Sequence, residues 1–163
     1  MHFSGTEQCT LDANGRLKLP PRVIATFKML GGLEVVLHCW PEGCLALLPK
    51  STWRRMYYEQ GYASSGNLDS IAGRQRQRLF TRFTHSTEIS AQGRISIPPA
   101  LRERAALQCG EQVLVAGYGE SLEIWQPQRF EQINAELDRL EAKELELNQE
   151  TLDKANKDEG QQP

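Results

Sequence analysis

Two arginines in this 163-residue chain each follow a glycine at matching positions. Arg16 ends the segment Asp12-Ala-Asn-Gly-Arg, and Arg94 ends Ser90-Ala-Gln-Gly-Arg, 78 positions further along. A glycine lets the backbone turn tightly, so each arginine is expected to project from the rigid start of a strand. Its planar guanidinium group suits two-pronged binding of phosphate oxygens or of the O6 and N7 atoms of guanine. The pair therefore predicts contacts with nucleic acid.

Lys18 adds a further positive charge to the first of these segments. It lies two residues after Arg16 and so falls on the same face of the predicted strand. Its counterpart in the second segment is Ser96, which makes the first segment the more basic. Four residues are expected to set the geometry of the turns: Asp12, Asn14, Gly15 and Gly93. Asn-Gly favours a type I′ turn, in which both central residues have positive φ.

A purely structural role for Arg16 is the competing interpretation. In it, Asp12 pairs with Arg16 across the turn and the pair only holds the hairpin together. Two observations count against this alternative without removing it. The second segment keeps Arg94 although Ser90 stands where the first has Asp12. Nor does a pairing role explain why the whole turn, strand and double proline are duplicated.

The duplication extends well beyond the two arginines. The segment 12–21 matches 90–99, and 35–37 matches 113–115 at the same offset. A repeat of about 47 residues is a supersecondary unit that is too short to bury a sufficient core alone. We therefore expect the two copies to fold as one body.

The spacing of apolar residues, glycines and prolines predicts the same order of elements in both copies: strand, turn, strand, helix, strand, turn, strand. A double proline ends a strand and suits the first turn of a helix. The expected strands are 6–11, 16–19, 34–38, 45–48, 112–116 and 122–125, and the expected helices within the copies are 22–29 and 100–106.

Further helices are expected outside the repeat. One begins at Ser51, a small-residue linker follows at 61–66, and a second helix covers 68–83. A C-terminal helix starts at Phe130, and the chain past Leu152 is expected to be disordered because it is polar and charged. The apolar seam of that helix is Phe130, Ile133, Leu137 and Leu140.

The charge is unevenly distributed along the chain. Residues 1–130 carry 15 lysines and arginines against 11 acidic residues, whereas residues 131–163 carry 4 against 10. The body is thus basic and the tail acidic, which suits binding of a polyanion by the body. In the helix at 68–83, Arg74, Arg78 and Arg82 share one face. That face is either solvated or paired with another subunit, or it contacts nucleic acid directly.

Enzymatic chemistry finds little support in the sequence. It contains no glycine-rich phosphate loop, no Gly-x-Ser-x-Gly and no His-Glu-x-x-His. Only Cys39 and Cys44 of the four cysteines are close together, so neither a metal site nor a cofactor is expected, and the thiols should be reduced. His38 is expected to be a core or interface residue. Without a signal peptide or a long apolar run, the chain is expected to be cytoplasmic.

The duplicated motif resembles the MraZ proteins of bacteria. Asp12-x-x-Gly15-Arg16 leads into Leu-Lys-Leu-Pro, and Gly93-Arg94 leads into Ile-Ser-Ile-Pro. The resemblance covers roughly residues 1–140 and implies two modules of the SpoVT-AbrB type, at 6–52 and 84–129. A helical linker at 53–83 would separate them, and an acidic helix with a disordered tail would occupy 130–163. The implied fold is α+β and mainly β: swapped hairpins form a pseudo-two-fold, β-barrel-like core with peripheral helices.

The same resemblance implies a nucleoid-associated transcriptional regulator without a cofactor. It would bind double-stranded DNA at direct repeats in the promoter of the division and cell-wall gene cluster. The homo-oligomer would be a closed ring that presents the Gly-Arg loops on one surface. By position, Arg16 and Arg94 take the DNA-contacting roles, with Lys18 a weaker candidate; Ser90 departs from the aspartate that is general in the second motif of this family. The alternative function is a protein-interaction or antitoxin-type module that acts through its C-terminal helix.

Overall fold

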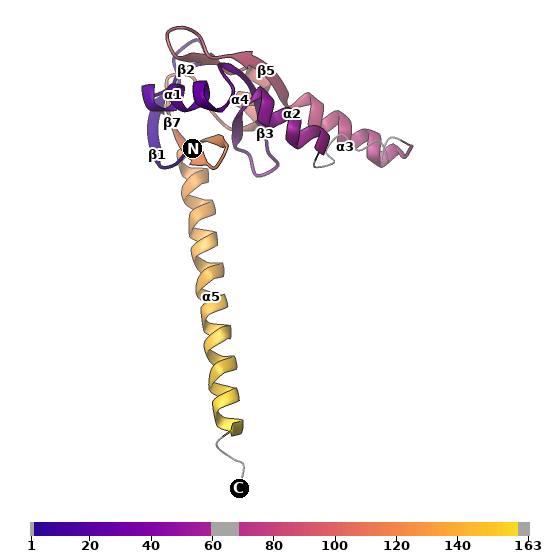
Figure 1. Ribbon diagram of the computed structural model, residues 1–163, viewed down its shortest axis with the longest axis vertical. Helices are drawn as coiled ribbons and strands as arrows, with labels where there is room; N and C mark the ends of the chain where they lie inside the picture. The colour runs from indigo at the N-terminus through magenta and orange to yellow at the C-terminus, as the bar shows by residue number, and fades with distance from the viewer. Residues whose placement is uncertain (1, 60–68, 160–163) are drawn as a thin grey trace. The chain divides into compact units, whose positions relative to one another are not determined.

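The structure is a computed structural model that describes residues 2–59 and 69–159, with side chains up to residue 154 (Figure 1). The chain divides into two compact units, Met1–Pro127 and Gln128–Pro163. The first unit contains β1 (Thr6–Thr10), β2 (Arg16–Lys18), α1 (Pro21–Leu30), β3 (Glu34–Cys39), β4 (Leu45–Pro49), α2 (Lys50–Glu59), α3 (Ile71–Arg82), β5 (Thr84–Glu88), β6 (Arg94–Ser96), α4 (Pro99–Arg104), β7 (Gln112–Tyr118) and β8 (Ser121–Trp125). The second unit contains the helix α5 (Pro127–Glu159) from its second residue onward.

The strands of the first unit form two antiparallel sheets. The larger has the order β1-β7-β8-β4-β3-β5, and the smaller is a two-stranded ribbon of β2 and β6. In the larger sheet, β1 of the first copy pairs with β7 of the second, and β5 of the second pairs with β3 of the first. Each copy thus lends its first strand to the other, so neither copy completes its sheet alone.

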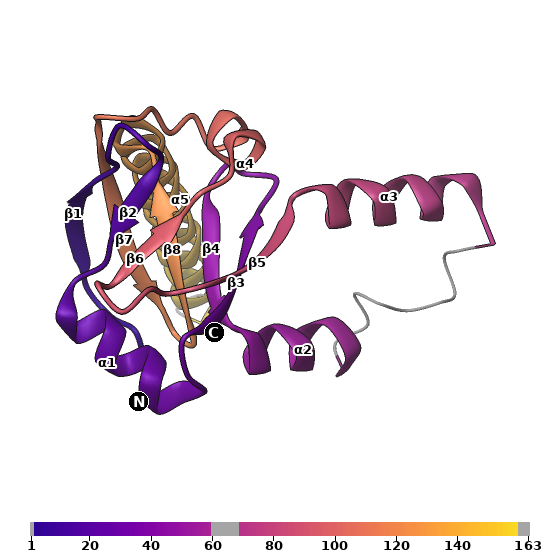
Figure 2. The same cartoon turned by 90° about the horizontal axis from the view of Figure 1, so that it is seen from above.

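The core lies between the ribbon and the larger sheet. Figure 2 shows β2 and β6 crossing one face of that sheet, with α1 and α4 near the two ends of the ribbon. Leu17 and Ile95 face each other across the ribbon, and both are fully buried in the main apolar cluster. Successive strand residues alternate between faces. Burying Leu17 therefore turns the side chains of Arg16 and Lys18 outward.

The double prolines start the two helices that flank the ribbon. Pro21 and Pro99 occupy the first helical positions of α1 and α4, where the missing N–H of proline costs no hydrogen bond. The α1 helix buries Val23 and Phe27, and α4 buries Leu101. These anchors fix where each strand ends and therefore where its basic residues lie.

An aromatic cluster joins α2, α3 and β3. The rings of Trp53 and Phe80 stack at 5.4 Å, and His38 lies 4.5 Å from the Phe80 ring centroid. Gln77 donates a hydrogen bond to the Tyr57 hydroxyl at 2.6 Å, which links the two helices. His38 is 3% exposed, so its predicted place in the core is confirmed. The predicted linker at 61–66 lies outside the described residues.

Several sequence expectations need correction. The α+β class is confirmed, but the described strands do not close into a barrel: β1 and β5 remain the edges of an open sheet. The prediction of disorder past Leu152 is wrong for residues 153–159, because α5 continues to Glu159. Within the described ranges, we find no helix with the length and apolar character needed to cross a membrane.

Candidate nucleic-acid interface

The β2–β6 ribbon brings the three predicted cationic contacts together. In its register Arg16 lies opposite Ser96, and Lys18 lies opposite Arg94. Residues directly opposite each other point to the same face of an antiparallel pair. Arg16, Lys18 and Arg94 therefore share the outward face, which we call the basic ribbon face. Two stretches 78 residues apart in sequence contribute to it.

Like charges meet on the basic ribbon face. Lys18 and Arg94 are both exposed, and across the described part of the chain neither has an acidic partner. Two cations directly opposite each other destabilise a strand pair. An anion bound over this face would relieve that repulsion.

The first turn differs from the predicted type I′ geometry. Gly15 donates its N–H to the Asp12 carbonyl at 3.0 Å, and Asp12 donates its N–H to the Arg16 carbonyl at 2.9 Å. Gly15 has a φ of +74°, but Asn14 does not have a positive φ. A type I′ turn needs positive φ at both central residues, so that prediction is wrong. The turn instead reaches the left-handed conformation only at its glycine.

The Asp12 side chain explains this geometry. Its Oδ1 accepts hydrogen bonds from the backbone N–H of Asn14 at 2.8 Å and of Arg16 at 3.0 Å. Its Oδ2 accepts from Nε of Arg16 at 2.9 Å. The hydrogen bond from the Arg16 backbone is the main reason that the pKa of Asp12 is lowered. The Asp12–Arg16 ion pair, which the purely structural interpretation requires, is therefore present. It involves only Nε of Arg16, and both Nη groups have no ion pair in the described part of the chain.

The second turn keeps the backbone geometry and loses the ion pair. Gly93 has a φ of +77° and donates to the Ser90 carbonyl at 2.8 Å. Ser90 Oγ accepts from the Arg94 backbone N–H at 3.1 Å, and it accepts from no other described residue. Among the residues that the structure describes, the Arg94 guanidinium group has no hydrogen-bond partner. Arg94 is therefore held less firmly than Arg16.

Each turn is attached to the opposite copy. The Gly15 carbonyl accepts from the Ile97 N–H at 2.9 Å, and the Gly93 carbonyl accepts from the Leu19 N–H at 2.8 Å. These two bonds fix the separation of the turns along the ribbon. Each turn is thus hydrogen-bonded to the end of the ribbon strand that the other copy contributes.

The residues behind the two glycines are unlike each other. A Cβ on Gly15 would lie 2.8 Å from Cζ of Arg102, and a Cβ on Gly93 would lie 2.4 Å from Cδ1 of Ile24. Arg102 was not among the residues predicted from the sequence to form the site. The repeat offset of 78 aligns it with Ile24, and this break in the repeat was the available signal.

We expect that exchanging Asp12 and Ser90 between the turns reverses which arginine side chain is held more firmly, so that Arg94 becomes the more ordered and Arg16 the more mobile. Asp12→Ser removes the acceptor of the Arg16 Nε–H, and Ser90→Asp creates one for Arg94. Nitrogen-15 NMR at neutral pH should then show faster solvent exchange of the Arg16 Nε–H and slower exchange of the Arg94 Nε–H. In the parent, the folded pKa of Asp12 is lowered, so its bonds are intact at neutral pH and are lost as pH falls through that lowered value. Unchanged exchange at both arginines would contradict the assigned role of Asp12.

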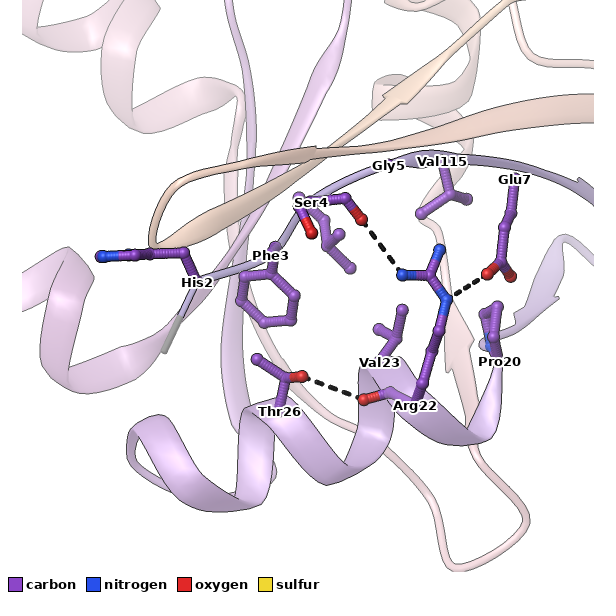
Figure 3. A pocket seen from close by; sticks show the side chains of 11 residues that line it. His2, Phe3, Ser4, Gly5, Glu7, Pro20, Arg22, Val23, Thr26 and Val115 are labelled. Carbon is purple, nitrogen blue, oxygen red and sulfur yellow. Dashed lines mark hydrogen bonds and ion pairs between the residues drawn. The ribbon is translucent and has the colours of Figure 1, made fainter.

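Arg22 is a cationic side chain with a different role. It points into a cavity of about 240 Å³ beside α1, where it pairs with Glu7 and donates to the Ser4 carbonyl at 3.1 Å (Figure 3). Its counterpart by repeat offset is Ala100. These contacts tie the N-terminal segment to α1. Because Glu7 neutralises its charge within the fold, Arg22 is a poor candidate for binding nucleic acid.

The other residues considered in the sequence as nucleic-acid contacts or metal ligands do not belong to the basic ribbon face. Arg74, Arg78 and Arg82 are exposed on α3, and their two interpretations stay open. None of the four cysteines forms a disulfide with a described residue: Cys39 and Cys44 are buried, Cys9 is half-buried and Cys109 is exposed. Burial raises the pKa of the Cys44 thiol. Within the described ranges, no three His, Cys, Asp or Glu residues come together as a metal site would require.

Comparison with known proteins settles the family. The sequence profile described as "MraZ protein, putative antitoxin-like" matches residues 2–76 and 80–153. The chain belongs to the MraZ family. The MraZ match extends to residue 153 and thus includes most of α5, whereas the resemblance seen in the sequence was expected to end near residue 140.

Curated MraZ relatives are similar over most of their length. Transcriptional regulator MraZ of Leptothrix cholodnii is 34% identical over 128 residues, which cover 78% of this chain and 82% of the relative. The protein of the same name from Cytophaga hutchinsonii is 33% identical over 129 residues, covering 79% and 82%. That of Treponema pallidum is 32% identical over 134 residues, covering 82% and 85%. Each of these MraZ relatives is named as a transcriptional regulator.

Proposed function

We propose that this MraZ family member is a DNA-binding transcriptional regulator that acts from the nucleoid in the cytoplasm. It binds direct repeats in the promoter of the division and cell-wall gene cluster. Arg16, Arg94 and Lys18 make the contacts. The relatives named as transcriptional regulators support this proposal, and so does the sequence resemblance.

The basic ribbon face is the observation that carries the proposal. It presents three cations on a two-stranded ribbon, and Lys18 opposes Arg94 without an acidic neighbour in the described part of the chain. Two-stranded ribbons fit the major groove of DNA, where arginine reads guanine by two parallel hydrogen bonds. Lysine at the same face suits a phosphate oxygen. The arrangement therefore combines base reading with backbone attachment.

We further propose that 6–52 and 84–129 act as two modules in a pseudo-two-fold unit, with 53–83 as the helical linker. The exchange of β1 and β5 between copies and the reciprocal bonds from Gly15 and Gly93 support this arrangement. A good two-pronged contact with a base contributes about 1–3 kcal/mol, so one chain reads DNA weakly. A closed ring of several chains would engage successive repeats and gain affinity through effective concentration.

An antitoxin-type interaction module is the second candidate. The family description includes the word antitoxin-like, and α5 carries leucines such as Leu137 and Leu140 that are each 52% exposed within an acidic helix. In that function the acidic helix would bind a protein partner. DNA binding would then depend little on the basic ribbon face.

Salt dependence and removal of the tail separate the two candidates. DNA binding should weaken steeply with salt, by about 0.9 logarithmic units in affinity per tenfold salt for each phosphate neutralised. A chain ending after Leu147 should bind promoter repeats as well as the full chain or slightly better, because negative charge is lost. Fluorescence anisotropy with repeat and scrambled duplexes measures both effects. A flat salt dependence, together with loss of function on tail removal, would favour the antitoxin-type module.

A further inference from the structure

The two turns of the basic ribbon face differ in what supports them. Gly15 rests on the guanidinium group of Arg102 from α4, whereas Gly93 rests on the aliphatic side chain of Ile24 from α1. A packing support needs no charge, as Ile24 demonstrates at the equivalent place. The charge of Arg102 therefore calls for its own explanation.

The contacts of Arg102 leave part of its guanidinium group free. Nη1 contacts Sγ of Cys109, and Nε is buried without a hydrogen-bond partner in the described structure. Nη2 also has no partner in the described part of the chain, but it does not share the burial of Nε. No ion pair of Arg102 occurs there either. A cation held in this way beside a basic turn is suited to an anion from outside the chain.

The position of Arg102 also restricts which part of DNA it can meet. The side chain is half-buried behind the turn, and its contacts with Gly15 and Cys109 limit its reach. Arg16, by contrast, stands on the outward face with a side chain that is 42% exposed. A group that reaches into a groove must project, whereas a group that meets the phosphate backbone can lie at the base of the protruding turn.

We propose that Arg102 is a phosphate-binding residue of the first turn, so that this site is assembled from both copies of the repeat. Arg102 meets a backbone phosphate through Nη2, while Arg16 reads a base edge. The second turn lacks this contact because Ile24 replaces the arginine. This proposal rests on the proposed DNA-binding function, and it makes the first turn the stronger of the two.

Exchange of the two supporting residues tests the proposal. Arg102→Ile gives the first turn the surroundings of the second, and Ile24→Arg does the reverse. Arg102→Ile should weaken binding to repeat and scrambled duplexes alike, by about five- to tenfold for each chain engaged. It should also reduce the salt slope by about 0.9 for each chain engaged. Ile24→Arg should increase both the affinity for DNA and the salt slope. Circular dichroism and size-exclusion chromatography establish that each variant is folded and assembled as the parent is.

Arg102→Lys separates charge from packing. Lysine keeps the positive charge and loses the planar group that supports Gly15, so a phosphate contact predicts a salt slope close to that of the parent. An unchanged slope in Arg102→Ile, or the same reduced slope in Arg102→Lys and Arg102→Ile, would overturn the proposal. If binding depends on Arg16 but not on Arg102, only this inference fails. If the parent binds no DNA, the proposed function fails with it.

Discussion

Replacing Arg16 with alanine should abolish sequence-specific DNA binding and leave the fold intact. The variant lacks the guanidinium group that projects from the first turn, while the backbone bonds of Asp12 to Asn14 and Arg16 remain available. Removing a two-pronged hydrogen bond to a base costs about 1–3 kcal/mol, and this cost recurs in every chain of an oligomer that engages a repeat. Specific affinity should therefore fall by more than about a hundredfold. Gel-shift titration with promoter repeats at about 0.15 M salt measures it.

Arg94→Ala is the matched control for this prediction. It removes the equivalent arginine from the turn that lacks an ion pair and is not supported by an arginine. We expect a smaller decrease in affinity than for Arg16→Ala, because Arg94 is less firmly positioned and must be ordered on binding. An Arg16→Ala variant that shifts the promoter DNA as well as the parent would exclude Arg16 as the specific contact. Equal decreases in both variants would show instead that the two turns contribute alike.

Local sequence patterns predicted the elements well where a single physical signal dominated. Alternation placed Leu17 inward and its two charged neighbours outward, and the double prolines marked the starts of α1 and α4. The prediction that the two copies exchange strands had a different basis. No local pattern shows that β1 joins β7, because pairing over that distance depends on the whole sheet; the expectation came from the family resemblance.

The errors arose where side chains overrode a backbone preference. Asn-Gly favours a type I′ turn, but the Asp12 carboxylate binds two following N–H groups and stabilises a turn with positive φ at glycine alone. Polar composition suggested disorder after Leu152. A polar helix can still persist through contacts one turn apart, such as the hydrogen bond from Gln149 to Asp153 at 3.2 Å.

The candidate site was predictable only in part. Arg16 and Arg94 stood out because the repeat carries both, and Lys18 stood out because it lies two residues after Arg16 on the same strand face. The ribbon places all three on one face. Arg102 was missed because it lies in a helix of the other copy, far from Gly15 in the sequence. Contacts between distant segments of this kind become visible only once the chain is folded.

Acidification should destabilise the first unit through His38. Burial, with a smaller contribution from the charge of Arg104, lowers the pKa of His38 from 6.5 to about 4. The imidazole is surrounded by the rings of Trp40, Trp53 and Phe80 and contacts the Thr84 hydroxyl at 2.9 Å. A proton on this ring would place a charge among apolar groups. The unfolded chain, in contrast, accepts the proton at its ordinary pKa.

The sign of the effect follows from the lowered folded pKa. The contribution of neutral His38 to stability is complete above pH 6.5 and is lost as pH falls towards about 4, because the unfolded state binds the proton first. Between about pH 7.5 and about pH 5 the free energy of unfolding should fall by about 2 kcal/mol from this group. Urea unfolding followed by tryptophan fluorescence measures the change.

His38→Phe isolates the contribution of the histidine. It keeps an aromatic ring in the cluster and removes the titrating group, so its free energy of unfolding should lose about 2 kcal/mol less than the parent's over the same pH interval. Glu123 cancels in this comparison because it is present in both proteins. Burial raises the pKa of its carboxyl, so it acts in the opposite sense and destabilises the fold as pH rises. If parent and variant lose equal stability between the two pH values, His38 binds its proton at the same pH in the folded and unfolded states, and burial in the aromatic cluster does not lower its pKa.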